Sequence, residues 1–261
     1  ITDSILLQTY FVDKITEGTF EVNVMVPPGA SPATYEPTAK QMALLGNSNV
    51  YLRIGYIEFE KSWMYKIKST NKTLKIFDTS KEVDIIETGV IDHGDHQHGS
   101  IDPHIWMSPK RTQLIIKNTF EALKEIYPEK VAEFKSNYQK LVKEIISLDN
   151  KVISSLSDID NRSFLIFHPA LTYFANDYKL QQIPMQLEGK DPSPSYMKQI
   201  IDKAKKNDTK LIFIQEQFDT ENARVIANEI DCKIIVIDPL GYEWKKQIEH
   251  ITRSLLKYNN N

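Results

Sequence analysis

Two short runs near the end of the chain, Leu211-Ile212-Phe213-Ile214 and Ile234-Ile235-Val236-Ile237, decide the fold class. Every position in both runs is apolar, as in strands of a parallel sheet that helices cover on both faces. Helical patterns at Pro194–Lys206 and Thr220–Ile230 precede the two runs and fit the crossover connections that parallel strands need. The sequence therefore predicts an α/β fold.

Similar apolar runs occur in both halves of the chain, and we expect each of them to form a strand. In the second half they are Ser163–His168, Leu180–Met185, Lys210–Glu216 and Lys233–Asp238. In the first half they are Ile5–Tyr10, Phe20–Val26, Val50–Gly55 and Leu74–Phe77. The two groups of strands predict two separate sheets.

A long helical pattern separates the two groups. One helix is expected to start at Ser108-Pro109, with serine as its cap and proline in the first turn. Pro128 starts a second helix, whose apolar residues recur in steps of three and four up to about Leu156, a span of roughly 40 Å. We therefore expect two α/β lobes with mostly parallel sheets, joined by a long rigid helix. The expected boundaries are 1–125, 126–160 and 161–261.

Composition narrows the possible partners. The 261 residues include 32 basic and 35 acidic side chains, a formal net charge of −3, which argues against nucleic acid as the main partner.

No stretch approaches the roughly 18–20 apolar residues of a membrane helix. The first residues lack the pattern of a signal peptide. A chain from which an export signal has been removed would look the same, so this observation does not decide whether the protein is exported. Cys232 is the only cysteine and is expected to be a small buried residue, so a cysteine zinc cluster is excluded.

Polar side chains stand where the expected strands of the second half end. His168 follows Phe164–Phe167, Glu216 follows Leu211–Gln215, and Asp238 follows Ile234–Ile237. Ligands of open α/β sheets bind beyond the carboxyl ends of the strands. Imidazole together with carboxylate suits zinc, manganese or iron(II), whereas magnesium and calcium prefer oxygen alone. A further histidine, His104, precedes the helix start at Ser108-Pro109. The pattern predicts a transition-metal site.

Four stretches together resemble the metal-binding receptors of bacterial zinc and manganese ABC importers, the ZnuA/TroA-like family. They are Val26-Pro27-Pro28-Gly29-Ala30-Ser31-Pro32-Ala33-Thr34-Tyr35-Glu36-Pro37, Asp102-Pro103-His104-Ile105-Trp106-Met107-Ser108-Pro109, Phe167-His168-Pro169-Ala170 and Asp238-Pro239-Leu240-Gly241. They follow the order of the family and cover nearly the whole chain. The resemblance implies two lobes around a metal, and it implies that His104, His168 and Asp238 are ligands.

The resemblance also implies a fourth ligand, a histidine at the position where this chain has Ala33. Alanine cannot coordinate a metal, and three explanations stay open. Water could complete the coordination, or another side chain could replace the histidine, with Glu216 first and Glu36 or a loop histidine behind it. Alternatively, the protein binds metal poorly or has a different ligand.

The family implies the biological role as well. It implies zinc as the metal, with manganese as the alternative, and the membrane permease of an ABC importer as the partner. We expect an exported monomer, periplasmic or held at the cell surface by a lipid anchor. The segment His93–His98, with three histidines, is either a weak metal collector or a solvated loop.

Two other classes of protein stay open. A metal-dependent hydrolase could use the same ligands with Glu216 as general base, although no HExxH pattern occurs. An adhesin or scaffold could retain a vestigial metal site, as Ala33 would permit. We expect the receptor, which is not an enzyme.

Overall fold

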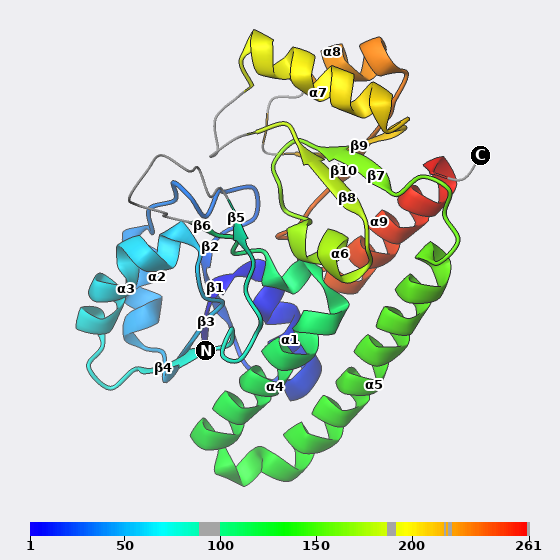
Figure 1. The fold of residues 1–261 in the computed structure, drawn as a ribbon. Helices are drawn as coiled ribbons and strands as arrows, with labels where there is room; N and C mark the ends of the chain where they lie inside the picture. The colour runs from blue at the N-terminus through cyan, green and yellow to red at the C-terminus, as the bar shows by residue number, and fades with distance from the viewer. Residues whose placement is uncertain (89–99, 187–191, 217, 219–220, 260–261) are drawn as a thin grey trace, which may run out of the picture. The chain divides into compact units, whose positions relative to one another are not determined.

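The computed structural model describes residues 1–88, 100–186, 192–216, 218 and 221–259, and Figure 1 follows the chain through them. In the described part of the chain, the first four strands are β1 (Thr2–Ile5), β2 (Asn23–Val26), β3 (Val50–Arg53) and β4 (Lys75–Asp78). Their helices are α1 (Leu6–Thr16), α2 (Ala39–Gly46), α3 (Glu58–Thr70) and α4 (Pro109–Ile126). The strands form one parallel sheet in the order β2-β1-β3-β4.

A second parallel sheet has the order β10-β9-β7-β8. Its strands are β7 (Ser163–Ile166), β8 (Gln181–Pro184), β9 (Leu211–Gln215) and β10 (Lys233–Ile237). Its helices are α6 (Thr172–Asp177), α7 (Pro194–Lys206), α8 (Glu221–Ile230) and α9 (Trp244–Tyr258). The two sheets confirm the predicted α/β class with parallel strands. A two-stranded antiparallel pair, β5 (Glu87–Thr88) and β6 (Ser100–Ile101), and the short helix η1 (Ile105–Met107) precede α4.

The long helix predicted between the two groups of strands is present. A short 3-10 turn, η2 (Pro128–Lys130), leads into α5 (Val131–Leu156), which has 26 residues. No helix in the described ranges is both long enough and apolar enough to cross a membrane.

Contacts between Cα atoms divide the chain into two compact units. The first contains residues 1–85, 110–147 and 240–244, and the second contains residues 86–109, 148–239 and 245–261. The boundary falls inside α5, after Ser147. Residues 86–109 precede the long helix in the sequence but belong to the second unit, which matters for the position of His104.

In the first unit the apolar residues of β3 alternate between the two faces of the sheet. Val50 and Leu52 are fully buried and cluster with Val12 of α1 and Ala122 of α4. Figure 1 shows α2 and α3 on the other side of this sheet. Helices on both faces explain why the strands carry few exposed residues.

One strand prediction was wrong. Ile5–Tyr10 does not form a strand, because α1 begins at Leu6 and the strand lies earlier, at Thr2–Ile5. The buried residues Leu7, Tyr10, Phe11 and Ile15 follow helical spacing. Three of the four residues in β1 are polar and fully buried, so a search for apolar runs overlooks this strand.

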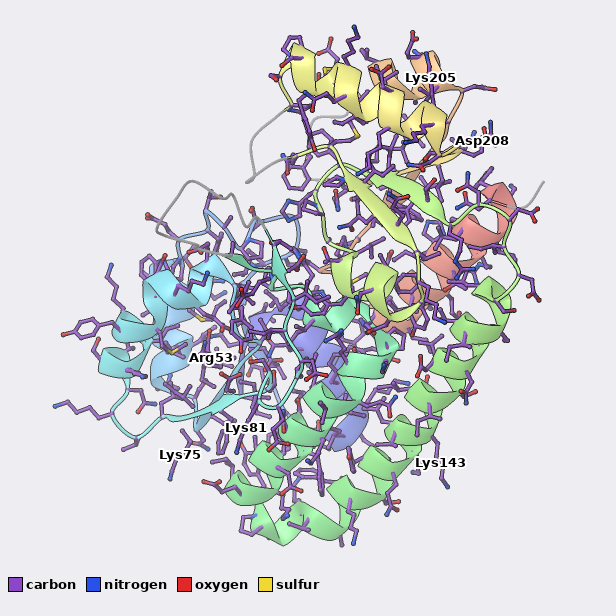
Figure 2. The ribbon with its side chains drawn as sticks, in the orientation of Figure 1. Arg53, Lys75, Lys81, Lys143, Lys205 and Asp208 are labelled. Atoms are coloured by element: carbon purple, nitrogen blue, oxygen red, sulfur yellow. The ribbon has the colours of Figure 1, made fainter. Side chains whose placement is uncertain are left out.

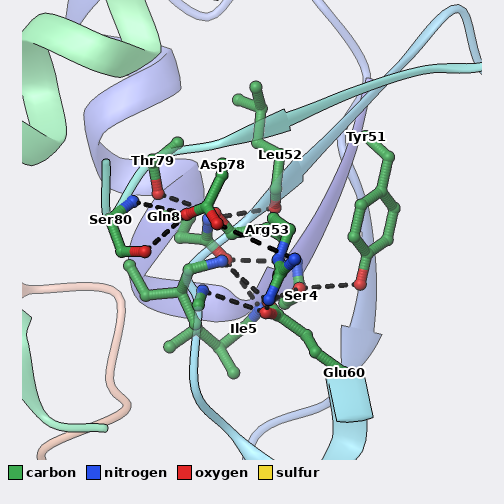
Figure 3. A network of polar contacts seen from close by, with 12 residues as sticks. Ser4, Ile5, Gln8, Tyr51, Leu52, Arg53, Glu60, Asp78, Thr79 and Ser80 are labelled. Carbon is green, nitrogen blue, oxygen red and sulfur yellow. Dashed lines mark hydrogen bonds and ion pairs between the residues drawn. The ribbon is translucent and has the colours of Figure 1, made fainter. Parts of the chain in front are cut away.

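Buried side chains complete the hydrogen bonding at the carboxyl ends of β1 and β3 (Figure 3). The Glu60 carboxylate accepts hydrogen bonds from the backbone N–H groups of Ile54 and Gly55, at 2.7 and 2.9 Å, and from Arg53 Nε at 3.2 Å. Gln8 Oε1 accepts from the N–H of Ser4 at 3.1 Å, and its Nε2 donates to Leu52 O at 3.0 Å. These contacts satisfy main-chain groups that have no partner strand beyond the sheet edge.

In the second unit, α7 and α8 lie on one side of the sheet, and α6 and α9 lie on the other (Figure 1). The α7–α8 side is an apolar cluster that includes Leu165, Ile212, Ile200 and Ile226. An exposed ion pair of 2.7 Å joins Lys205 of α7 to Glu229 of α8 (Figure 2 labels Lys205). Exposed pairs contribute little stability, so burial of apolar side chains holds these helices on the sheet.

Cys232, which we expected to be buried, is only half-buried and lies against this cluster.

Asp3 in β1 provides a test of the first unit. The carboxyl is fully buried, its Oδ1 has no hydrogen-bond partner, and Thr9 Oγ1 donates to Oδ2 at 3.1 Å. Burial raises the pKa of Asp3 from 3.8 to about 8, although the Thr9 hydrogen bond opposes the shift. Between these values the folded chain binds a proton that the unfolded chain releases, so stability falls as pH rises through this window.

We therefore predict that wild-type protein loses stability relative to Asp3→Asn, by on the order of a few kcal/mol between pH 5 and 8. Thermal unfolding of both proteins across this range measures the effect. The matched control is Asp202→Asn, at an exposed position of α7, which should show no such trend. Parallel stability profiles for wild type and Asp3→Asn would contradict the prediction.

Candidate metal centre

The second sheet brings three of the predicted site residues to one edge. The strands β10, β9 and β7 are adjacent and parallel, so their carboxyl ends lie together. Glu216 directly follows β9, and Asp238 directly follows β10. His168 stands two residues beyond β7, after Phe167, whose N–H donates to Phe213 O of β9 at 2.9 Å. The sequence correctly placed these residues at the strand ends.

Side-chain hydrogen bonds hold the His104 segment, residues 86–109, to the rest of the second unit. The buried Tyr173 hydroxyl donates to Asp102 O at 2.7 Å, and Trp106 Nε1 donates to Pro239 O at 2.8 Å. Ser108 Oγ donates to Asp177 Oδ2 at 2.6 Å. These bonds reach α6 and the end of β10 from a segment far away in the sequence. They explain why residues 86–109 belong to the second unit.

As a result, His104 and His168 lie side by side. Their ring centroids are 5.2 Å apart with an interplanar angle of 73°. The His104 side chain is 13% exposed, and its Nδ1 lies 2.8 Å from Asp102 Oδ1. The same oxygen accepts the His104 backbone N–H at 2.8 Å. Burial alone would raise the pKa of Asp102, but the charge and hydrogen bonds of His104 outweigh it and lower that pKa.

The His168 ring has close neighbours on several sides. Its Nδ1 lies 3.1 Å from Gln186 Oε1, and Phe218 stacks on it with centroids 5.4 Å apart. Burial, followed by the nearby His104, lowers the pKa of His168 from 6.5 to about 4. The imidazole is therefore neutral at neutral pH, the form in which histidine binds metals.

A buried amide fixes the backbone of His168. Gln215 Nε2 donates to His168 O at 2.8 Å, and Gln215 Oε1 accepts the His168 N–H at 3.2 Å. The Gln215 side chain ends β9 and is fully buried. The paired hydrogen bonds connect the end of β7 to the end of β9 where the regular ladder stops.

Asp238 and Glu216 are less closely integrated. Both are exposed, and the Asp238 backbone N–H donates to Gln247 Oε1 at 3.2 Å. Within the described ranges, no group of three His, Cys, Asp or Glu side chains is close enough to hold a metal ion. The structure thus pairs the two histidines but does not gather the two carboxylates around them.

The remaining candidates lie elsewhere. Ala33 and Glu36 are both exposed, and both belong to the first unit, between β2 and α2. The segment His93–His98 lies outside the described residues. His250 is in α9, with its Nε2 3.1 Å from Val236 O.

Chemically, the centre offers two imidazoles whose Nδ1 atoms both face oxygen acceptors. When Nδ1 carries the proton, Nε2 keeps its lone pair and can bind a metal ion. A borderline-soft ion such as zinc suits this donor set, and zinc accepts carboxylate or water in its remaining positions.

Sequence reasoning did not identify Asp102, Gln186 or Gln215. Asp102 had a usable signal, because it stands two residues before His104 and could reach the same ring. Gln215 is a polar residue that ends the apolar run Leu211–Ile214. Gln186 follows β8, the edge strand that sequence reasoning did not connect with the site.

These features define a two-unit α/β protein with a histidine pair beyond the ends of a parallel sheet. A family model described as "Zinc-uptake complex component A periplasmic" (ZnuA) matches residues 1–257. The chain belongs to this family, which confirms the resemblance inferred from the four motifs. A crystal structure of a ZnuA protein superposes with a TM-score of 0.92 and 32% sequence identity, covering 99% of this chain and 98% of that chain.

Curated relatives agree with this assignment. The zinc-binding lipoprotein AdcA of Streptococcus pneumoniae R6 is 27% identical over 240 residues, which are 88% of this chain and 48% of AdcA. This chain thus spans about half the length of the AdcA relatives that it matches. The high-affinity zinc uptake system protein ZnuA of Bacillus subtilis 168 is 25% identical over 240 residues, 88% of this chain and 75% of that protein.

The low pKa of His168 yields a prediction for the metal-free protein. Its ring should remain neutral until the pH approaches about 4, whereas the unfolded chain protonates near 6.5. The stability contributed by this group is therefore present above pH 6.5 and is lost as pH falls toward 4, by a few kcal/mol at most. An NMR titration of the histidine rings measures the midpoint, and His168→Gln assigns the signal. A midpoint above 6 would show that the ring is solvated.

Proposed function

We propose that this protein captures zinc outside the cytoplasm and delivers it to the membrane permease of an ABC importer. Family membership and the partly buried His104–His168 pair together support the proposal. The pair is the main support for the proposal, because two imidazoles held side by side can bind one ion between them.

We propose that the Nε2 atoms of His104 and His168 and the Asp238 carboxylate bind the zinc. Structural and transport zinc sites are usually four-coordinate, so one more ligand is needed. With Ala33 in place of the expected histidine, Glu216 at the end of β9 or a water molecule would supply it. Both carboxylates are exposed at the ends of their strands, and we propose that they turn toward an ion bound by the two histidines.

Manganese is the alternative cargo. A manganese-bound periplasmic metal-binding protein from Candidatus Liberibacter asiaticus has the same fold, with a TM-score of 0.83 and 19% identity. Two imidazoles favour zinc over manganese, since manganese has a stronger preference for oxygen ligands and lower intrinsic affinity.

The proposal includes the cellular setting. We propose an exported protein, periplasmic or anchored to the cell surface by lipid, that acts as a monomer and binds rather than transforms its cargo. The names of the lipoprotein AdcA and the periplasmic ZnuA family support this setting. We propose 1–125 and 161–261 as the two functional lobes and 126–160 as the helix that links them. Nucleic acid has no place in this role, as the net charge of −3 indicates.

The proposal predicts that zinc raises the melting temperature of the protein and that a chelator lowers it. A ligand specific for the folded state stabilises it by about 2.7 kcal/mol at a free concentration of one hundred times Kd.

His168→Ala and Asp238→Ala should each weaken zinc binding at least about tenfold, because each removes one proposed ligand. Calorimetric titration measures both variants, with His250→Ala as the matched control.

The same titration identifies the fourth ligand. If Glu216 binds the ion, Glu216→Ala should weaken binding as Asp238→Ala does, and if water binds, it should have little effect. Unchanged zinc affinity in both His168→Ala and Asp238→Ala would contradict the proposed centre.

A further inference from the structure

The two histidines of the proposed centre have chemically different partners. His104 Nδ1 faces the Asp102 carboxylate at 2.8 Å, whereas His168 Nδ1 faces the neutral Gln186 amide at 3.1 Å. A carboxylate can only accept a hydrogen bond, so it keeps the proton on Nδ1 of His104. An amide has both a donor and an acceptor end, so the end that it presents decides the tautomer of His168.

The structure presents the acceptor end. Gln186 Oε1 points to His168 Nδ1. Gln186 follows β8 and is only 4% exposed. The Gln186 backbone is itself fixed, because its N–H donates to Phe167 O at 2.9 Å. The Gln186 backbone is therefore hydrogen-bonded to Phe167, the residue before His168, and this contact places the amide beside the ring.

The ring has little freedom to escape this contact. Gln215 fixes the His168 backbone through both its N–H and its carbonyl. Phe218 stacks on the ring at an interplanar angle of 27°, and His104 lies at 73° to it. A ring rotation that exchanged the two nitrogens would abandon the only hydrogen bond described for the imidazole.

We propose that Gln186 is a positioning residue that holds His168 with the proton on Nδ1, so that Nε2 is free before zinc arrives. The inference rests on the proposed function for its purpose, but the tautomer is a property of the metal-free protein. A histidine in water carries its proton mainly on Nε2, which would block the coordinating atom. The Gln186 hydrogen bond replaces that preference with the binding-competent form.

The test reads the tautomer directly in metal-free protein. Two-bond 1H–15N correlation spectra of histidine-labelled protein near pH 7 distinguish an Nδ1 proton from an Nε2 proton. We expect His168 to carry the proton on Nδ1 in wild type and in Gln186→Glu, which keeps an acceptor. In Gln186→Met, which has similar length and no acceptor of comparable strength, the proton should move to Nε2.

Zinc affinity is then measured on the same variants. Gln186→Met should bind zinc about 10- to 100-fold more weakly, and Gln186→Glu should recover the affinity. Gln181→Met, at an exposed position on β8, the strand that precedes Gln186, is the matched control and should match wild type in both readouts.

The outcomes separate this inference from the proposed function. An Nε2 proton on His168 in wild type, or unchanged zinc affinity after Gln186→Met has moved the proton, would overturn the role of Gln186. Absence of zinc binding in wild type would overturn the proposed function, while the spectra would still decide the tautomer.

Discussion

The structure depends on how a parallel sheet ends. Beyond the last ladder hydrogen bond, the main chain of each strand carries N–H and carbonyl groups that have lost their partners but are still buried. In this protein, side-chain amides and carboxylates take over. Gln8 and Glu60 serve the ends of β1 and β3 in the first unit, and Gln215 serves the ends of β7 and β9 in the second.

This solution has a consequence in the second unit. Because the Gln215 amide bonds both the N–H and the carbonyl of one residue, it fixes that residue as firmly as a strand would. That residue is His168. The strand ends at Ile166, and the Gln215 amide holds the main chain two residues further on, at His168. In a binding protein such rigidity matters because a ligand that is already placed loses little entropy when the ion arrives.

Much of this arrangement could be predicted from the sequence. The apolar runs marked seven of the eight main strands, and the polar residues after them marked the sheet edge at which we propose that the metal binds. The exception was β1, where Thr2, Asp3 and Ser4 are buried through tertiary contacts that local hydrophobicity cannot reveal. The grouping of His104 with the second unit also rests on distant contacts, such as Trp106 with Pro239 and Tyr173 with Asp102. No periodicity encodes them.

The partners of the two histidines determine the chemistry of the site, and only the contact between Asp102 and His104 had a signal in the sequence. A carboxylate that accepts the Nδ1 proton raises the basicity of the imidazole and strengthens its bond to a metal, whereas an amide orients the ring without adding charge. His104 has the first kind of partner and His168 the second. The proposed receptor would have to bind its cargo tightly enough to capture it and still release it to a permease. In the proposed centre, the carboxylate partner of His104 would strengthen its bond to the ion, whereas the amide partner of His168 would orient that ring for capture without adding charge.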